Sequence, residues 1–173
     1  MRIFTKVIFY VLIFSLLHFG YELTGWDFLI PFCGIDESVF EHLKMGFWAY
    51  LLVSLLEFAL LKRKHRLPNN FWFSRLISTM FIPWIIVVVW YVVPGIVGKV
   101  ESIALELVWA FFVVVVSGIV GIVLERLTEK MHFGTTVKLM ILILFFVLIF
   151  FFVRFSFSKP WVDLFQNPEL VID

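Results

Sequence analysis

Apolar residues fill five long stretches of this chain, and short polar segments separate them. The stretches cover about residues 7–23, 39–61, 71–93, 102–124 and 136–153. Each has the roughly 17–25 residues that an apolar helix needs to cross a bilayer. The pattern therefore predicts an all-α, polytopic membrane protein with about five transmembrane helices. We expect residues 1–173 to form a single integral membrane domain.

The composition agrees with this prediction and excludes other classes of protein. Of the 173 residues, 62% are hydrophobic, and the mean hydropathy is +1.05. Soluble domains are about 45–50% apolar. A net charge of +1 creates no field that would attract nucleic acid, so the predicted partner is the lipid bilayer. The single cysteine, Cys33, excludes an internal disulfide framework and a cysteine-based zinc cluster.

The distribution of basic residues predicts the orientation in the membrane. Ten of the 14 Lys and Arg residues fall on one side if the N-terminus is inside, with the densest block at 62–66. Basic residues favour the cytoplasmic side, so we expect a cytoplasmic N-terminus and an extracytoplasmic tail at 154–173. The long connection at 24–36 is half apolar, and either lies on the membrane surface or re-enters the protein.

Polar side chains gather at the outer ends of the predicted helices. The set comprises His18, Tyr21, Glu22, Glu37, Glu41, His42, Lys44, Tyr91 and Glu106. His18 and Glu22 are four residues apart and share one helical face. The first and second spans are consecutive and antiparallel, so their polar groups should lie at similar depth. Because charges at membrane depth are costly unless paired or hydrated, this outward-facing vestibule is the candidate functional site.

Histidines and carboxylates together suit a divalent metal such as Zn or Mn. The candidate ligands are His18, Glu22, Glu37, Glu41 and His42. In that case Glu37 or Glu106 could act as a general base on a metal-bound water, which would make the protein a hydrolase. The spacing matches no established metalloprotease motif, so whether the protein is an enzyme stays open.

Two other functions fit the same residues. A polar pocket facing outward suits a substrate-capture or transport subunit, with Tyr21, Lys44, Tyr91 and Glu106 as ligand-binding residues. Alternatively, the charges pair with one another and only lock the helix packing, as Glu41 and Lys44 could at their i, i+3 spacing. A homo-oligomer or a membrane partner subunit is compatible with all three functions.

Two features of the predicted inner half concern packing. Glu57 lies about a turn from the end of the second span, and we expect it to reach the interface or to pair with Arg63 or Arg75. Ser117, Gly118 and Gly121 form a surface of small residues, which favours close approach of a neighbouring helix.

Four stretches resemble an uncharacterised family of small prokaryotic multi-pass membrane proteins. Residues 36–44, Asp-Glu-Ser-Val-Phe-Glu-His-Leu-Lys, resemble its Asn-Glu-Ser-x-Trp-Glu-His-Leu-Lys signature and differ at the Asn and Trp positions. Residues 18–22, 91–98 and 159–168 resemble further family segments, although the tail has one Pro where the family has a pair. The resemblance implies a shared fold without an activity. The residues that match its motifs are His18, Glu22, Glu37, Glu41, His42 and Lys44.

Overall fold

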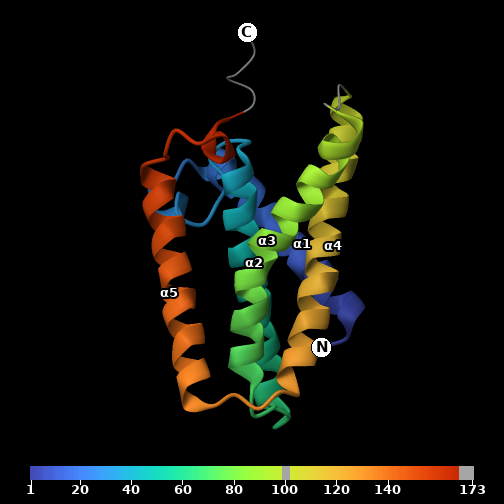
Figure 1. Ribbon diagram of the computed structural model, residues 1–173, viewed down its shortest axis with the longest axis vertical. Helices are drawn as coiled ribbons and strands as arrows, with labels where there is room; N and C mark the ends of the chain where they lie inside the picture. Colours follow the sequence, from blue (N-terminus) through green and yellow to red (C-terminus); the bar gives the residue numbers. More distant parts are fainter. Residues whose placement is uncertain (99–101, 168–173) are drawn as a thin grey trace.

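The computed structural model describes residues 1–98 and 102–167, and this part of the chain is all-helical (Figure 1). The long helices are α1 (Ile3–Thr24), α2 (Val39–Arg63), α3 (Phe71–Val97), α4 (Ile103–Glu129) and α5 (Thr135–Phe157). Two short 3₁₀ helices are η1 (Asp27–Leu29) and η2 (Asp163–Phe165). All five long helices are long and apolar enough to cross a membrane, which confirms the prediction of an all-helical protein with five such helices. Residues 168–173 of the predicted tail lie outside the described residues.

The segment between α1 and α2 reverses direction at a glycine. Gly25 has φ 63°, a left-handed conformation that glycine adopts without steric cost, and its N–H donates to Tyr21 O at 2.8 Å. The chain then runs through η1 and returns to α1, where the N–H of Gly34 donates to Leu17 O at 3.1 Å. This return places the start of α2 beside the end of α1.

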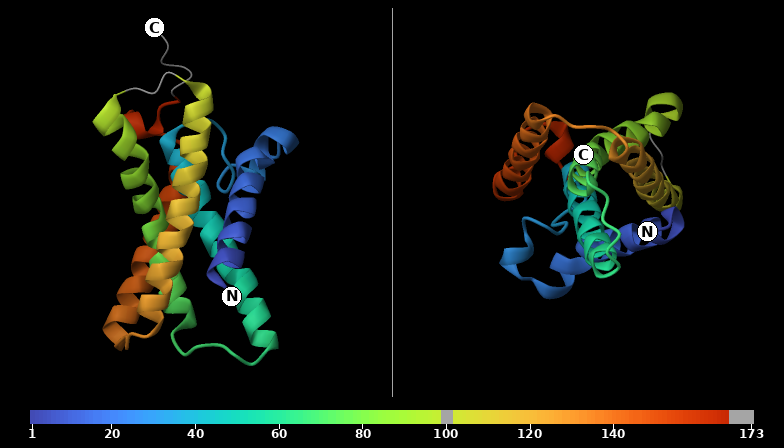
Figure 2. Two further views of the ribbon diagram at one scale, coloured as in Figure 1. Left: turned by 90° about the vertical axis from the view of Figure 1, so that its right-hand side faces the viewer. Right: turned by 90° about the horizontal axis from the view of Figure 1, so that it is seen from below.

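Helices α1 to α4 pack as a bundle, and α5 stands at its edge (Figures 1 and 2). In the most apolar 18-residue stretch of α2, 61% of residues are buried, against 17% in α5. The outer surface of α5 exposes large apolar side chains such as Leu142, Phe146 and Phe150. Such a surface suits contact with lipid, whereas α2 forms the centre of the protein.

The middle of the bundle is closely packed around two buried tyrosines. Tyr10 of α1 and Tyr50 of α2 meet edge to face at 5.8 Å between ring centroids. A Cβ atom added to Gly118 would lie 2.6 Å from the Tyr10 ring, and one added to Gly121 would lie 2.7 Å from Ile82. These contacts confirm that the small residues of α4 admit its neighbours closely.

Candidate metal centre

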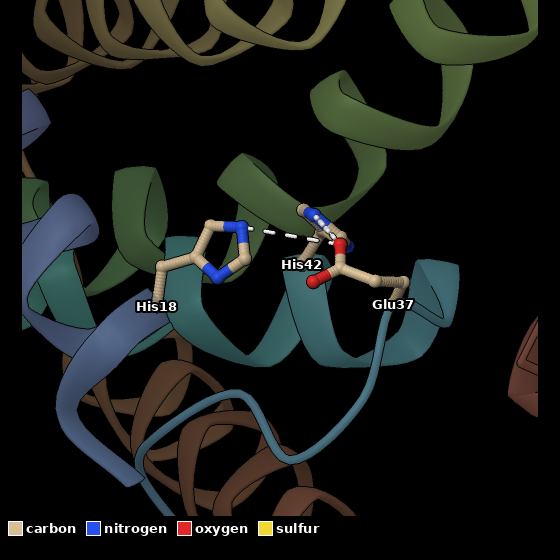
Figure 3. A group of neighbouring side chains, drawn as sticks. All are labelled: His18, Glu37 and His42. Carbon is tan, nitrogen blue, oxygen red and sulfur yellow. Dashed lines mark ion pairs between the residues drawn. The ribbon is translucent and has the colours of Figure 1, made fainter. Parts of the chain in front are cut away.

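Three side chains converge at the end of the bundle where α2 begins (Figure 3). His18 comes from α1, His42 from the first turn of α2, and Glu37 from the segment just before α2. One ligand atom from each lies within 4.8 Å of the other two. Glu37 Oε2 lies 3.9 Å from Nε2 of His18 and 3.7 Å from Nε2 of His42. These three residues form a candidate metal site, and we refer to this candidate as the metal centre.

The metal centre is partly open to solvent. The side chains of His18, His42 and Glu37 are 28%, 21% and 45% exposed, respectively. Phe14 lies against both histidine rings, at 6.5 and 6.4 Å between centroids. A bound ion would therefore have an apolar wall on one side and room for water on the other.

Hydrogen bonding fixes the orientation of His42. Its Nδ1 lies 3.0 Å from the carbonyl oxygen of Ser38, an oxygen that can only accept. In the neutral ring Nδ1 then carries the hydrogen, and the lone pair of Nε2 faces Glu37. Metal-binding histidines are commonly held by such a bond from the other ring nitrogen.

The distances fit a small divalent ion after a modest movement. Zn binds His nitrogen and carboxylate oxygen at about 2.0–2.2 Å, so neighbouring ligands in a tetrahedron are roughly 3.3 Å apart. The separations of 3.7 and 3.9 Å exceed this value by only a few tenths of an ångström. All three ligand atoms lie within 4.8 Å of one another and would have to move closer together to hold the ion.

Glu41 and Lys44 belong to a buried network next to the metal centre. Lys44 Nζ lies 2.5 Å from Glu41 Oε2, and both side chains are fully buried. The Lys44 ammonium also donates to Ile30 O at 2.7 Å and to Ser156 Oγ at 3.1 Å. Lys159, which follows α5, adds an ion pair to Glu41 Oε1 at 3.0 Å. These groups are already paired with one another.

Asp36 joins the same network from the loop before α2. It pairs with Lys159, and its Oδ1 accepts from the N–H of Ser38 at 2.9 Å. Burial alone would raise the pKa of Asp36, but the hydrogen bonds from Lys159 and Ser38 outweigh burial and lower the pKa below its ordinary value. The carboxylate is therefore charged over most of the pH range.

The remaining predicted site residues have no described polar contact with this cluster. Glu22, Tyr91 and Glu106 are exposed, and Tyr21 is half-buried. Within residues 1–98 and 102–167, no side-chain hydrogen bond or ion pair joins these four to His18, Glu37 or His42. The structure thus brings together three of the five predicted metal ligands.

A second buried network lies toward the other end of the bundle. Lys6 Nζ lies 2.6 Å from Glu57 and 2.5 Å from Glu125. Arg75 lies 3.3 Å from Glu57 and 3.1 Å from Glu125, which confirms the predicted pairing of Glu57 with Arg75. Tyr50 donates to Glu125 at 2.9 Å. We call Lys6, Glu57, Arg75 and Glu125 the inner network.

Sequence reasoning found only one pair of the inner network. It placed Lys6 and Arg75 on the basic side of the membrane and gave Lys6 no partner, whereas the two side chains are 1% and 4% exposed. The available signal was the position of Glu57 and Glu125 inside apolar stretches on the basic side of the membrane. Buried carboxylates there require cations, and the nearest ones come from other helices.

Comparison with known proteins places the chain in a family. A family model described as "Family of unknown function (DUF6512)" matches residues 2–169. The chain belongs to this family. The match confirms the expectation of an uncharacterised family, and the family description states no activity. No curated protein and no solved structure matches the chain.

Proposed function

We propose that this protein is an integral membrane protein that binds a divalent metal ion, Zn or Mn, through His18, Glu37 and His42. The observation that carries the proposal is the convergence, within 4.8 Å, of the imidazole of His18 on α1 with the Glu37 carboxylate and His42 imidazole at the start of α2. Two nitrogens and one oxygen leave a fourth position for water in a tetrahedral site. The partial exposure of Glu37 gives the ion a route to the centre.

Metal binding is better supported than hydrolysis or transport. A hydrolase needs a base beside the metal-bound water, and Glu106 is exposed on α4 without a described contact to the centre. A transporter needs a path, whereas Tyr10, Tyr50 and Gly118 are closely packed in the middle of the bundle. The third function, locking of the helix packing, fits a different set of charges. Glu41 and Lys44 neutralise each other in the interior.

Metal titration of the purified protein tests the proposal. After removal of bound ions with a chelator, we expect Zn²⁺ or Mn²⁺ to bind with one ion per chain and to raise the melting temperature. His18→Ala and His42→Ala should each weaken binding by about 100-fold or more, because each removes one of three ligands. A wild-type protein that takes up no stoichiometric metal by elemental analysis and calorimetry contradicts the proposal.

Glu22→Gln is the matched control for these variants. It removes a carboxylate from the same end of α1, but Glu22 is exposed and has no described contact with the centre. We expect an unchanged Kd for the metal. A loss equal to that of Glu37→Gln would instead favour the wider ligand set predicted from sequence.

We also propose that the metal centre faces the extracytoplasmic side of a cell membrane. The support is the excess of Lys and Arg at the opposite end of the helices. A topology reporter fused behind residue 173 should be active outside the cytoplasm, and a cytoplasmic signal would reverse the assignment. A single domain, a prokaryotic origin and an oligomeric or partner-bound state stay predictions.

A further inference from the structure

Lys159 contacts the two residues that flank the proposed metal ligand Glu37 in the sequence, Asp36 and Ser38. Its ammonium pairs with the carboxylate of Asp36 and donates to Ser38 Oγ at 3.2 Å. Asp36 in turn accepts from the N–H of Ser38 at 2.9 Å. The residues on either side of Glu37 are thereby tied to a single cation.

The same contacts extend to the second ligand on α2. The carbonyl of Ser38 accepts from Nδ1 of His42 at 3.0 Å, which turns Nε2 toward Glu37. Any displacement of Ser38 therefore changes the position of Glu37 and the orientation of His42 together. Both ligands depend on a segment that Lys159 holds.

Aromatic packing fixes the segment that supplies Lys159. Phe165 of η2 packs against Phe40 of α2 at 4.6 Å and against Phe155 of α5 at 5.2 Å between ring centroids. Lys159 Nζ lies 6.0 Å from the centre of the Phe40 ring. The segment after α5 is thus anchored on α2, with Lys159 directed at Asp36 and Glu41.

We infer that Lys159 is a positioning residue for the metal centre, acting through Asp36 and Ser38. This inference rests on the proposed metal binding. Lys159 touches none of the three ligands, and its charge opposes a bound cation. By Coulomb's law alone, removal of this charge should tighten metal binding. Weaker binding would therefore identify positioning as the role of Lys159.

The test compares Lys159→Met with Lys159→Arg in the full-length protein. We expect Lys159→Met to weaken Zn²⁺ or Mn²⁺ binding by about 10–100-fold, the usual effect of losing a group that supports a metal ligand. Lys159→Arg keeps the charge and the hydrogen bonds and should restore most of the affinity. Arg154→Gln, an exposed cation near the same end, controls for charge alone and should leave the Kd unchanged or slightly lower.

A double-mutant cycle with Asp36→Asn separates positioning from general loss of structure. If Lys159 acts through Asp36, the double variant should bind metal no more weakly than either single variant. Additive losses, or a Lys159→Met variant with the wild-type Kd, overturn the inference while leaving metal binding intact. A wild-type protein that binds no metal overturns the proposed function and this inference together.

A separate observation concerns the opposite end of the bundle. There, every carboxylate that the structure describes is paired, because Lys6, Arg75 and the N-terminal amine contact Glu57, Glu125 and Glu129. Apart from the partly exposed Glu129, which pairs with Arg75, the charged groups that the structure describes on this surface are cations. These are Arg2, Lys62, Arg63, Lys64, Arg66, Arg126, Lys130 and Lys138, and we call them the basic surface.

The basic surface lies at the edge of the apolar helices. Lys62 Nζ lies 5.6 Å from the ring centre of Phe58, and Lys138 Nζ lies 5.3 Å from that of Phe73. In such contacts the methylene groups of the lysine side chain lie along the aromatic ring, and the ammonium group stays at the boundary between the apolar helix surface and water. Asn70 donates to Met131 O and joins the two loops at this end into one surface.

We propose that the basic surface binds the headgroups of anionic phospholipids. Cations next to a membrane surface attract anionic lipid additively, at about five-fold per charge. The position of the charges around the apolar perimeter favours lipid over nucleic acid, which would need a surface that projects away from the bilayer.

Quenching of tryptophan fluorescence by brominated lipids tests this proposal. In mixed vesicles we expect brominated phosphatidylglycerol to bind the protein at least about ten-fold more strongly than brominated phosphatidylcholine. Changing Lys62, Arg63, Lys64 and Arg66 to Gln should remove most of that preference. Exchanging the same four residues between Lys and Arg preserves the charge and should preserve the preference.

Three outcomes would overturn the proposal. They are equal quenching by both lipids, an unchanged preference in the Gln variant, or displacement of the lipid by short RNA at lower concentration. Millimolar inorganic phosphate should compete no better than chloride at equal ionic strength, because a surface of separate charges has no dedicated phosphate pocket.

Discussion

At the scale of single residues, the inner network shows how charges are stabilised inside this protein. Lys6 contacts two carboxylates, and Arg75 contacts the same two from another helix. Each ion keeps a partner at hydrogen-bond distance, which offsets the cost of removing it from water. The arrangement is sensitive to the loss of any member.

Lys6→Met should therefore destabilise the protein markedly. Removing one partner of a buried ion pair costs about 3–5 kcal/mol, and the contacts of Arg75 with both carboxylates place the expected loss near 3 kcal/mol. Unfolding in mixed detergent micelles measures the change. Lys130→Gln removes an exposed cation and should change the free energy of unfolding by less than about 0.5 kcal/mol. Equal effects for both variants would contradict a buried network.

The lowered pKa of Asp36, at the end of the bundle near the metal centre, makes the free energy of unfolding depend on pH. The pKa of its carboxyl is lower in the folded protein than its ordinary value of 3.8. The unfolded chain then binds a proton first as pH falls, so the stabilisation is present above pH 3.8 and is lost as pH drops through the folded pKa. Asp36→Asn should thus be less stable than wild type at pH 7, with a difference that shrinks below pH 3.8. A difference that stays constant from pH 7 to pH 3 would show that Asp36 does not titrate with folding.

At the scale of helices, close contact between α1 and α4 depends on residues without side-chain bulk. Gly118 lies against the Tyr10 ring, whose hydroxyl is 3.1 Å from Ser117 Oγ. The aromatic ring cannot move aside easily, because it also packs against Tyr50. The two helices can approach closely only while position 118 remains glycine.

Gly118→Ala should accordingly cost about 1–3 kcal/mol by overpacking. Gly95 on α3 has no atom within 4 Å of an added Cβ, so Gly95→Ala should be neutral or stabilising by up to about 1 kcal/mol. Thermal unfolding of both variants in the same detergent provides the comparison. A neutral Gly118→Ala variant would mean that α1 and α4 separate readily.

The five helices were predictable because the length of an apolar stretch can be read directly from the residue types. All five lie where the hydropathy of the sequence places them. The candidate metal centre was predictable in part: His18 and His42 were assigned to neighbouring helix ends, whereas Glu37, expected in the first turn of the second span, lies just before α2. The pairing of Glu41 with Lys44 followed from their i, i+3 spacing, but the second partner of Glu41, Lys159, was not predictable. That residue is 123 positions from Asp36 and reaches it only through the packing of α5.

At the scale of the whole molecule, the reactivity of Cys33 measures how often the segment between α1 and α2 separates from the rest of the protein. Its thiol is 2% exposed, and burial raises its pKa above the ordinary value. Both effects reduce the thiolate that reacts with alkylating reagents. We expect a water-soluble maleimide to label the folded protein slowly and the denatured protein rapidly, with a rate ratio of about 100 or more. Rapid labelling of the folded protein would show that the segment between α1 and α2 opens readily.

The inner network also constrains the order in which the protein can assemble during synthesis. When α1, α2 and α3 have formed, Lys6, Arg75 and the N-terminal amine share the carboxylate of Glu57. The balancing carboxylates, Glu125 and Glu129, arrive only with the last turns of α4. Until the ribosome has released α4, the first three helices carry an excess positive charge at membrane depth. We therefore expect stable docking of the nascent bundle only after translation has passed residue 129.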